Sequence, residues 1–382
     1  MPRQPRERKI ARRPLLVESL ERREVLAGNI TAAVVGDTLM LTGDNLDNSA
    51  VVISLGGGQY AVAGNNTTTV NGSTNNFVTN RAVSHISANM NGGNDALSLG
   101  NNAAAIDTLA GDLNQRSVLA VPNVTTLQSR ISAATSVTSF SLGGNLTFLG
   151  GAGNDLLAVV GTIGRTITAN LGSSLSTGLN AIGIDASATA SRGAVGGAVS
   201  VVGGEQADSV LLRDIAVNGV LSAVLGGGAN SVDLINASVR AGMSVIGGGG
   251  VDSVEIDSSS VARVMTLLLG NGANALTVED SDLSNVVVTT GSGIDTLNFT
   301  NTDIHTGMTI NTGEGADVVS LNAVDIDGFF TAFLGGGNDR LTGVNSRAKM
   351  AVLNGGLGSD QLSLDAATVA AIDHLFRVLF ES

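Results

Sequence analysis

Carboxylate side chains follow glycine-rich turns at nearly constant intervals in the second half of this chain. Each turn ends on an aspartate or asparagine, called here the landing residue, and successive landing residues are 22, 22, 22, 21, 22, 22 and 21 residues apart. Carboxylate oxygens together with turn carbonyls are the hard oxygen ligands that Ca²⁺ prefers. The pattern predicts either cation sites or hydrogen-bonded corners. The regular landing residues are Asp208, Asn230, Asp252, Asn274, Asp295, Asp317, Asp339 and Asp360.

The residues that follow each landing residue predict the element that positions it. The second and fourth are apolar and the residue between them is small or polar, as in Val254 and Ile256 around Glu255. This alternation is typical of a half-buried strand. A fixed period of roughly 20–50 residues indicates copies of one unit stacked on one another. The sequence therefore predicts an all-β, single-domain parallel β-solenoid, a right-handed β-helix of about 22 residues per coil with glycine at its corners.

Three glycine turns match the pattern G-G-x-G-x-D in full, and others keep its last four positions. The full matches end at Asp155, Asp252 and Asp360. This pattern resembles the haemolysin-type, or RTX-like, calcium-binding repeat. The resemblance implies that Ca²⁺ lies between the turns of adjacent coils, held by turn carbonyls and aspartate carboxylates. Carried over residue by residue, it assigns metal ligation to Asp155, Asp252, Asp295, Asp317, Asp339 and Asp360.

The chain departs from that family in its period and in some landing residues. The family has two turns per coil, whereas this chain has one, and Asn230 and Asn274 replace the acid in two coils. Between Asp295 and Asp360 the landing residues are all acidic, so carboxylates one coil apart repel unless a cation lies between them or their pKa rises. We expect weak calcium binding there, in the ~10⁻⁴–10⁻³ M range of extracellular modules. The alternative is a corner that hydrogen-bonds to its own backbone without metal.

A second acidic row lies eight residues after three successive landing residues. It consists of Asp282, Asp303 and Asp325, with His305 and Asp327 beside it. The predicted fold is similar to that of right-handed β-helix polysaccharide lyases and hydrolases, which place catalytic acids or calcium on such a lateral face. Carboxylates ~6.5–9.5 Å apart can serve as acid and base on a glycan. However, a polar bend is where solvated aspartate is expected, no Arg or Lys is evident nearby in the repeat, and the histidines show no metal spacing. A carbohydrate-active enzyme or glycan binder is therefore the alternative, and the leading prediction is a protein without enzymatic activity.

Charge is divided unevenly along the chain. The first 24 residues hold eight basic and four acidic residues, whereas the remainder holds 12 basic and 29 acidic residues, a net charge of −17. An acidic body argues against nucleic-acid binding. No run of about 18 apolar residues is present, so no transmembrane segment is predicted. The chain also has no cysteine, which excludes disulfides and cysteine-ligated metals.

The N-terminal segment resembles an export signal. Leu20, Glu21, Arg23, Leu26 and Gly28 form the pattern L-E-x-R-x-x-L-x-G. This is similar to the N-terminal segment of many large surface and exported proteins of planctomycete-type bacteria. The resemblance implies that residues 1–28 direct the chain to the bacterial cell surface or the extracellular space. The alternative is a basic tail with no targeting role.

These observations predict three regions. Residues 1–28 form the export segment, residues 29–365 the solenoid, with irregular coils to 207 and regular coils from 208, and residues 366–382 an amphipathic helix capping the last coil behind Asp365. Segment 65–80 is expected to form a hairpin or long loop, and the insertion at 101–141 remains unassigned, with a short helix or loop near Asp107. The expected role is an exported or cell-surface structural or interaction protein, with calcium stiffening its turns and a protein or glycan partner in the cell envelope.

Overall fold

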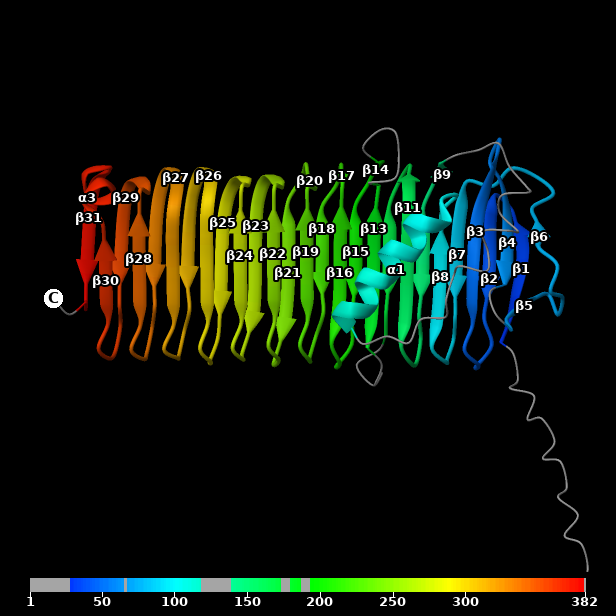
Figure 1. The fold of residues 1–382 in the computed structure, drawn as a ribbon, viewed down its shortest axis with the longest axis horizontal. Helices are drawn as coiled ribbons and strands as arrows, with labels where there is room; N and C mark the ends of the chain where they lie inside the picture. Colours follow the sequence, from blue (N-terminus) through cyan, green and yellow to red (C-terminus); the bar gives the residue numbers. More distant parts are fainter. Residues whose placement is uncertain (1–27, 65–66, 118–138, 173–178, 187–192, 381–382) are drawn as a thin grey trace, which may run out of the picture.

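The computed structural model of the protein describes residues 28–64, 67–117, 139–172, 179–186 and 193–380. These residues form a parallel β-solenoid with about 22 residues per coil, which confirms the predicted fold class. The coils follow one another along a single axis, with the N-terminal strands at one end and the C-terminal strands at the other (Figure 1). The export segment 1–28 lies outside the described residues except for Gly28.

The first strand of each coil begins at or beside the landing residue. These strands pair in parallel from coil to coil and form one continuous row. In chain order the row contains β3 (Ser49–Gly56), β8 (Asp95–Leu99), β11 (Asp155–Ile163), β13 (Asn180–Asp185), β16 (Asp208–Arg213), β19 (Ser231–Ile235), β22 (Ser253–Asp257), β24 (Ala275–Glu279), β26 (Thr296–Asn311), β27 (Val318–Phe333), β28 (Arg340–Val344) and β30 (Gln361–Leu364).

Two further rows of strands complete each coil. The second row contains β9 (Phe140–Leu142), β14 (Gly193–Val195), β17 (Ile215–Val217), β20 (Ser238–Val239), β23 (Ser260–Gly270), β25 (Asp282–Thr290) and β29 (Arg347–Asn354). The C-terminal end of β11 and the long strands β26 and β27 extend from the first row into this one. The third row contains β2 (Thr38–Thr42), β7 (His85–Asn89), β10 (Leu146–Leu149), β12 (Ile167–Asn170), β15 (Val199–Val202), β18 (Leu221–Val224), β21 (Met243–Gly248) and, after the long strands, β31 (Ile372–Val378).

The core consists of ladders of identical or similar apolar side chains. Val210 pairs with Val232, then with Val254, Leu276 and Leu297 on successive coils, and each is at most 1% exposed. Full burial of such a side chain stabilises the fold by about 1.5–3 kcal/mol. Because the side-chain period of a strand is two, this inward row fixes the register of every coil.

A second corner repeats between the first and second rows of strands. Its residue adopts the left-handed conformation although it is not glycine, with φ between 47° and 55° on seven coils. Two residues of the set, Ser258 and Asp280, precede Ser259 and Ser281, whose buried hydroxyls accept the N–H of the preceding coil at 3.0 and 3.2 Å. The sequence analysis described this region only as a polar bend. The full set is Asp214, Asn236, Ser258, Asp280, Asn301, Ala323 and Asn345.

The N-terminal end is closed by antiparallel pairs that the sequence analysis did not resolve. β1 (Asn29–Val35) pairs with β2, and β3 pairs with β4 (Gln59–Gly64), in each case antiparallel. The expected hairpin or loop at 65–80 contains two short strands, β5 (Thr69–Val70) and β6 (Phe77–Val78). β5 pairs with β1, and β6 pairs with β4. This end is therefore covered by hairpins rather than left as an open edge.

The insertion after β8 forms a helix, α1 (Ala103–Ser117), which lies across the outside of the first row (Figure 1). Leu109 of α1 is fully buried in a second apolar cluster with Leu156 and Leu211, which point outward from their strands. A Cβ on Gly183 would lie 2.7 Å from the Leu109 Cδ1 atom, so glycine allows the helix to approach. Arg213 anchors the helix through an ion pair with Asp112 at 2.6 Å.

The predicted capping helix over 366–382 is wrong beyond its first turn. Asp365 does cap a helix, accepting the Thr368 N–H at 2.8 Å, but α3 covers only Ala366–Ala370. The chain then continues as β31, parallel to β29. Its apolar pattern suits either element, and the unpaired N–H and C=O groups along β29 favour the strand, because a helix would leave them without partners.

The inward ladder makes a direct prediction about stability. Replacing Val254 with Asp buries a charge without a partner, so we expect the free energy of unfolding to fall by about 3–5 kcal/mol. Ser253→Asp on the exposed side of the same strand serves as the matched control and should change stability little. Thermal unfolding followed by circular dichroism measures both, and equal midpoints for the two variants would show that the inward face is wrongly assigned.

Candidate functional site

The landing side chains point into the solenoid and form one continuous hydrogen-bonded row, called here the Asx ladder. At most steps the backbone N–H of one member donates to the Oδ1 atom of the next, and the side-chain amide of Asn180 donates to Asp208 Oδ1 at 3.0 Å. The donor–acceptor distances along the row are 2.7–3.2 Å. The members are Asn48, Asp95, Asp155, Asn180, Asp208, Asn230, Asp252, Asn274, Asp295, Asp317, Asp339 and Asp360.

All six predicted metal ligands belong to this ladder. Each is at most 2% exposed. The structure thus brings them into one row, but as acceptors for the backbone of the neighbouring coil. The alternative prediction, a corner that bonds its own backbone, is seen through the second side-chain atom of four landing residues, whereas Oδ1 bonds the adjacent coil. The four are Asp208, Asn230, Asp252 and Asn274. Asn48 and Asn180 were missed because neither falls at the regular spacing.

Burial disfavours the ionised form of these carboxyl groups. It raises the pKa of Asp95 to about 8, that of Asp155 to about 7, and those of Asp208 and Asp339 to about 6. The pKa of Asp252 is also raised, again chiefly by burial, while hydrogen bonds from Asn230 and Gly248 oppose the increase. At neutral pH Asp95 is therefore largely protonated, and Asp155 is close to half-protonated.

The glycine turns take two forms, which differ in the group that faces the landing side chain. In the amide-in form, the N–H of the glycine four residues earlier donates to the carboxylate Oδ2, from Gly204 to Asp208 at 2.8 Å and from Gly248 to Asp252 at 3.3 Å. In the carbonyl-in form, that glycine has positive φ and its carbonyl accepts from the landing amide. Asn274, for example, donates its Nδ2 to the Gly270 carbonyl at 3.0 Å.

A glycine five residues before the landing residue makes room for the amide-in form at Asp208 and Asp252. A Cβ on Gly203 would lie 2.0 Å from the Asp208 Oδ2 atom, and a Cβ on Gly247 would lie 1.9 Å from the Asp252 Oδ2 atom. Any other residue would collide with the carboxylate. The glycine therefore serves the carboxylate directly, in addition to the usual role of glycine in tight turns.

The turns do not assemble the donor set of a calcium site around the predicted ligands. Ca²⁺ takes ~6–8 oxygen ligands. Here each Oδ1 accepts an N–H of the ladder, and turn carbonyls such as those of Gly313 and Glu314 accept N–H groups of neighbouring coils at 2.8 Å. Among the described residues no group of three or more His, Cys, Asp or Glu side chains is placed to hold a metal.

One observation nevertheless shows that some carboxylates lack a partner. The Oδ2 atoms of six ladder aspartates are buried and form no hydrogen bond. A buried acceptor without a donor costs free energy, so each of these oxygens would gain from a proton, a cation or an amide. The six are Asp95, Asp155, Asp295, Asp317, Asp339 and Asp360.

The lateral acidic row is also in register, but two of its three carboxylates, Asp282 and Asp325, have partners. Asp282, Asp303 and Asp325 stack on successive coils, and Arg347 continues the same row. The sequence analysis noted no nearby Arg or Lys. That was wrong, because Arg347 lies eight residues after Asp339, the offset that defines the row. Arg347 forms an ion pair with Asp325 and lies 3.6 Å from an Asp327 oxygen.

His305 joins this row to its neighbours. Its Nε2 atom lies 2.7 Å from Asp282 Oδ1, and its Nδ1 atom lies 3.7 Å from Asp327 Oδ2. The hydrogen bond to Asp282 is the main cause of the raised pKa of His305. The lateral face therefore joins Asp282, His305, Asp327, Arg347 and Asp325 into one chain of side-chain contacts across four coils.

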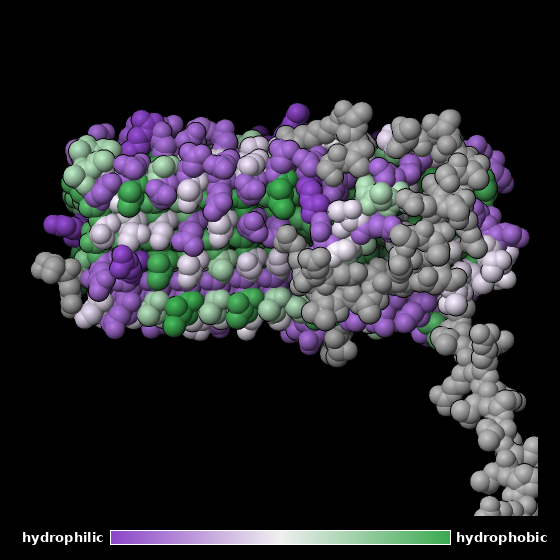
Figure 2. Space-filling view, in the orientation of Figure 1, coloured by the Kyte–Doolittle hydropathy of each residue, from purple (hydrophilic) through white to green (hydrophobic). Residues whose placement is uncertain are grey.

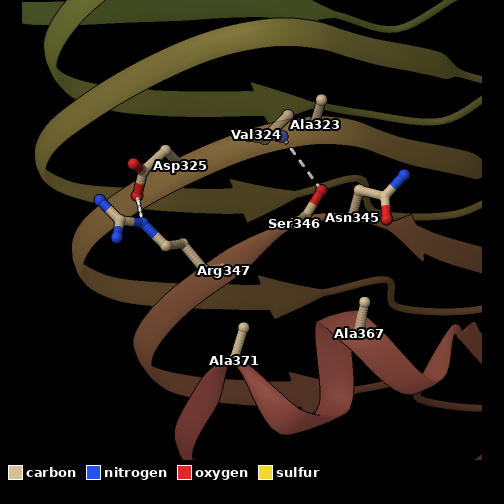
Figure 3. A pocket seen from close by; sticks show the side chains of 8 residues that line it. All are labelled: Ala323, Val324, Asp325, Asn345, Ser346, Arg347, Ala367 and Ala371. Carbon is tan, nitrogen blue, oxygen red and sulfur yellow. Dashed lines mark hydrogen bonds and ion pairs between the residues drawn. The ribbon is translucent and has the colours of Figure 1, made fainter.

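A shallow recess of about 300 Å³ adjoins the lateral row. Asp325, Ser346 and Arg347 lie on one side, and Ala367 and Ala371 lie on the other, where α3 replaces a strand of the coil (Figure 3). Ser346 donates its hydroxyl to the Val344 carbonyl and accepts the Val324 N–H, so its hydrogen-bonding capacity is largely used within the fold.

Comparison with known proteins identified no relative: no protein family, curated protein or solved structure matches this chain. Neither helix in the described part of the chain is long and apolar enough to cross a membrane.

The fit between carboxylate and glycine can be tested by adding one methyl group. We expect Gly247→Ala to destabilise the protein by about 1–3 kcal/mol, because the new Cβ displaces the Asp252 carboxylate from its donors. Gly249→Ala in the same turn is the matched control, because a Cβ there meets no atom within 4 Å. Urea unfolding measures both, and equal losses would contradict the assigned role of Gly247.

Proposed function

We propose that this protein is an exported, rod-shaped structural or interaction protein of the bacterial cell surface. The observation that carries the proposal is the continuity of the solenoid. One core and one Asx ladder run through the described coils with a nearly constant coil length. Such a body supplies length and a repetitive surface, whereas an enzyme on this scaffold would need a cleft formed by long loops.

The outer surface supports a repetitive partner. Val202, Val224, Ile246 and Leu268 stack on four successive coils, and each is 37–41% exposed. The face shown in Figure 2 mixes hydrophilic and hydrophobic residues along the length of the rod. Side chains repeated at the ~4.8 Å spacing of adjacent strands suit a partner with a repeat of its own. A glycan or protein polymer of the cell envelope has that property.

The lateral face gives little support to catalysis. Two of its carboxylates, Asp282 and Asp325, are engaged by His305 and Arg347. A general acid and base for glycan cleavage need free carboxyl groups on either side of a bound substrate. The carbohydrate-active alternative therefore has less support than a structural role.

The proposed location can be tested with the export segment. We expect the full chain, carrying a C-terminal tag in a planctomycete-type host, to be digested by protease added to intact cells. Residues 29–382 should remain protected inside the cell while keeping the β-rich circular dichroism of the full chain, because 1–28 lie outside the repeat. Equal protection of both forms would overturn the proposal of export, and loss of β-structure would show that 1–28 belong to the fold.

Calcium binding remains a prediction that rests on the resemblance of the turns. If Ca²⁺ binds the folded state, 10 mM Ca²⁺, about ten times the weak end of the expected range, should stabilise residues 29–382 by about 1.4 kcal/mol. Asp317→Asn with Asp339→Asn should remove most of that gain, because these residues border three adjacent acidic gaps. Asp303→Asn on the exposed lateral face is the control and should retain the gain. An unchanged midpoint of the wild type would reject calcium and leave the rod proposal intact.

A further inference from the structure

Four successive coils match the turn form to the landing residue. The amide-in turns of Asp208 and Asp252 have glycine five residues before the landing residue, at Gly203 and Gly247. The intervening carbonyl-in turns place leucine at the same position, Leu225 before Asn230 and Leu269 before Asn274. In these coils the side chain and the backbone group that faces it are complementary, acceptor to donor or donor to acceptor.

Asn230 shows how completely an amide satisfies the carbonyl-in form. Its Nδ2 atom lies 3.3–3.4 Å from the carbonyl oxygens of Gly226, Gly227 and Gly228, and 2.9 Å from Asp252 Oδ1. An aspartate in this turn would direct a second carboxylate oxygen at the same carbonyls. That oxygen accepts and cannot donate when ionised, so it would have no partner.

The turns that end at Asp317 and Asp339 have this mismatch. Gly313 and Gly335, four residues earlier, have φ of +92° and +96°, and their carbonyls accept the N–H groups of Gly336 and Leu357 on the next coil at 2.8 and 2.7 Å. The Oδ2 atoms of both aspartates are buried without a hydrogen bond. Thr312 lies beside the Asp317 carboxyl, but its hydroxyl proton is donated to the Leu334 carbonyl at 2.8 Å.

The mismatch cannot be relieved by changing the turn. The amide-in form brings Oδ2 to the place that a Cβ would occupy five residues earlier, and only glycine leaves that place empty. Residues Thr312 and Leu334 stand there in these two coils, and both are buried. Each turn is therefore held in the form that leaves its carboxylate without a donor.

We propose that these two mismatched turns make residues 312–360 a separate opening unit of the solenoid, which unfolds locally before the matched coils between 203 and 274. The strands of this unit pair with their neighbours as they do elsewhere in the solenoid, so the difference in local stability comes from the turns. Local stability follows the balance of satisfied and unsatisfied groups in each segment. A built-in weak segment of this kind allows the rod to bend or open within residues 312–360 while the matched coils between 203 and 274 stay intact.

The test is one chemical change at matched and mismatched turns. Asp317→Asn and Asp339→Asn should each raise the melting midpoint, and should slow hydrogen exchange in residues 312–340 about tenfold, because the amide restores the donor that these turns lack. Asp252→Asn removes the same charge from a matched amide-in turn and leaves the Gly248 N–H facing an amide. This control should lower the midpoint and accelerate exchange near its own turn. All measurements use the full chain with excess chelator.

The opposite signs separate turn matching from simple relief of charge repulsion. If all three variants are stabilised alike, repulsion along the ladder explains the effect and the proposal is wrong. If neither Asp317→Asn nor Asp339→Asn slows exchange, or if either variant fails to fold, the missing donor is not the source of weakness. Equal exchange rates for 312–340 and 203–274 in the wild-type protein would also overturn the proposal.

Discussion

The hydrogen bond between a buried Oδ1 atom and the backbone N–H of the adjacent coil is the interaction on which this architecture depends. A parallel stack leaves backbone groups unpaired wherever the chain turns a corner, and a buried N–H without an acceptor is costly. The Asx ladder supplies one acceptor per coil at the same height in each turn. Only a short side chain with an oxygen one carbon beyond Cβ reaches this position, which explains why every member of the ladder is Asp or Asn.

The glycine content follows from the same constraint. Glycine at the first turn position clears space for a carboxylate oxygen, as Gly247 does for Asp252. Later glycines of the turn pack against carbonyls of the neighbouring coil; a Cβ on Gly250, for example, would lie 1.6 Å from the Gly228 oxygen. The second corner solves the same problem with a left-handed residue that is not glycine, followed on several coils by a buried hydroxyl. The two corners fix the coil length, and the constant coil length aligns the apolar ladders.

Much of the candidate site was visible in the sequence, but its chemistry was not. All six predicted ligands lie in one row, and the spacing alone placed them there. The pattern G-G-x-G-x-D is compatible with a cation between oxygens and equally with a carboxylate that accepts backbone N–H groups, because both require acceptor-rich, glycine-lined turns. The decision depends on whether the turn carbonyls are free. Here they accept hydrogen bonds from neighbouring coils; the Gly336 N–H, for example, donates to the Gly313 carbonyl.

The sequence by itself determined the solenoid, its coil length, the inward ladders and the row of landing residues, because each follows from a period repeated many times. Only the tertiary structure decided features that occur once. α1 covers the first row because outward apolar residues such as Leu211 meet its Leu109. Residues after Ala370 form a strand because β29 presents an open edge. Periodic features are specified redundantly by local sequence, whereas single features depend on which surfaces the rest of the fold leaves uncovered.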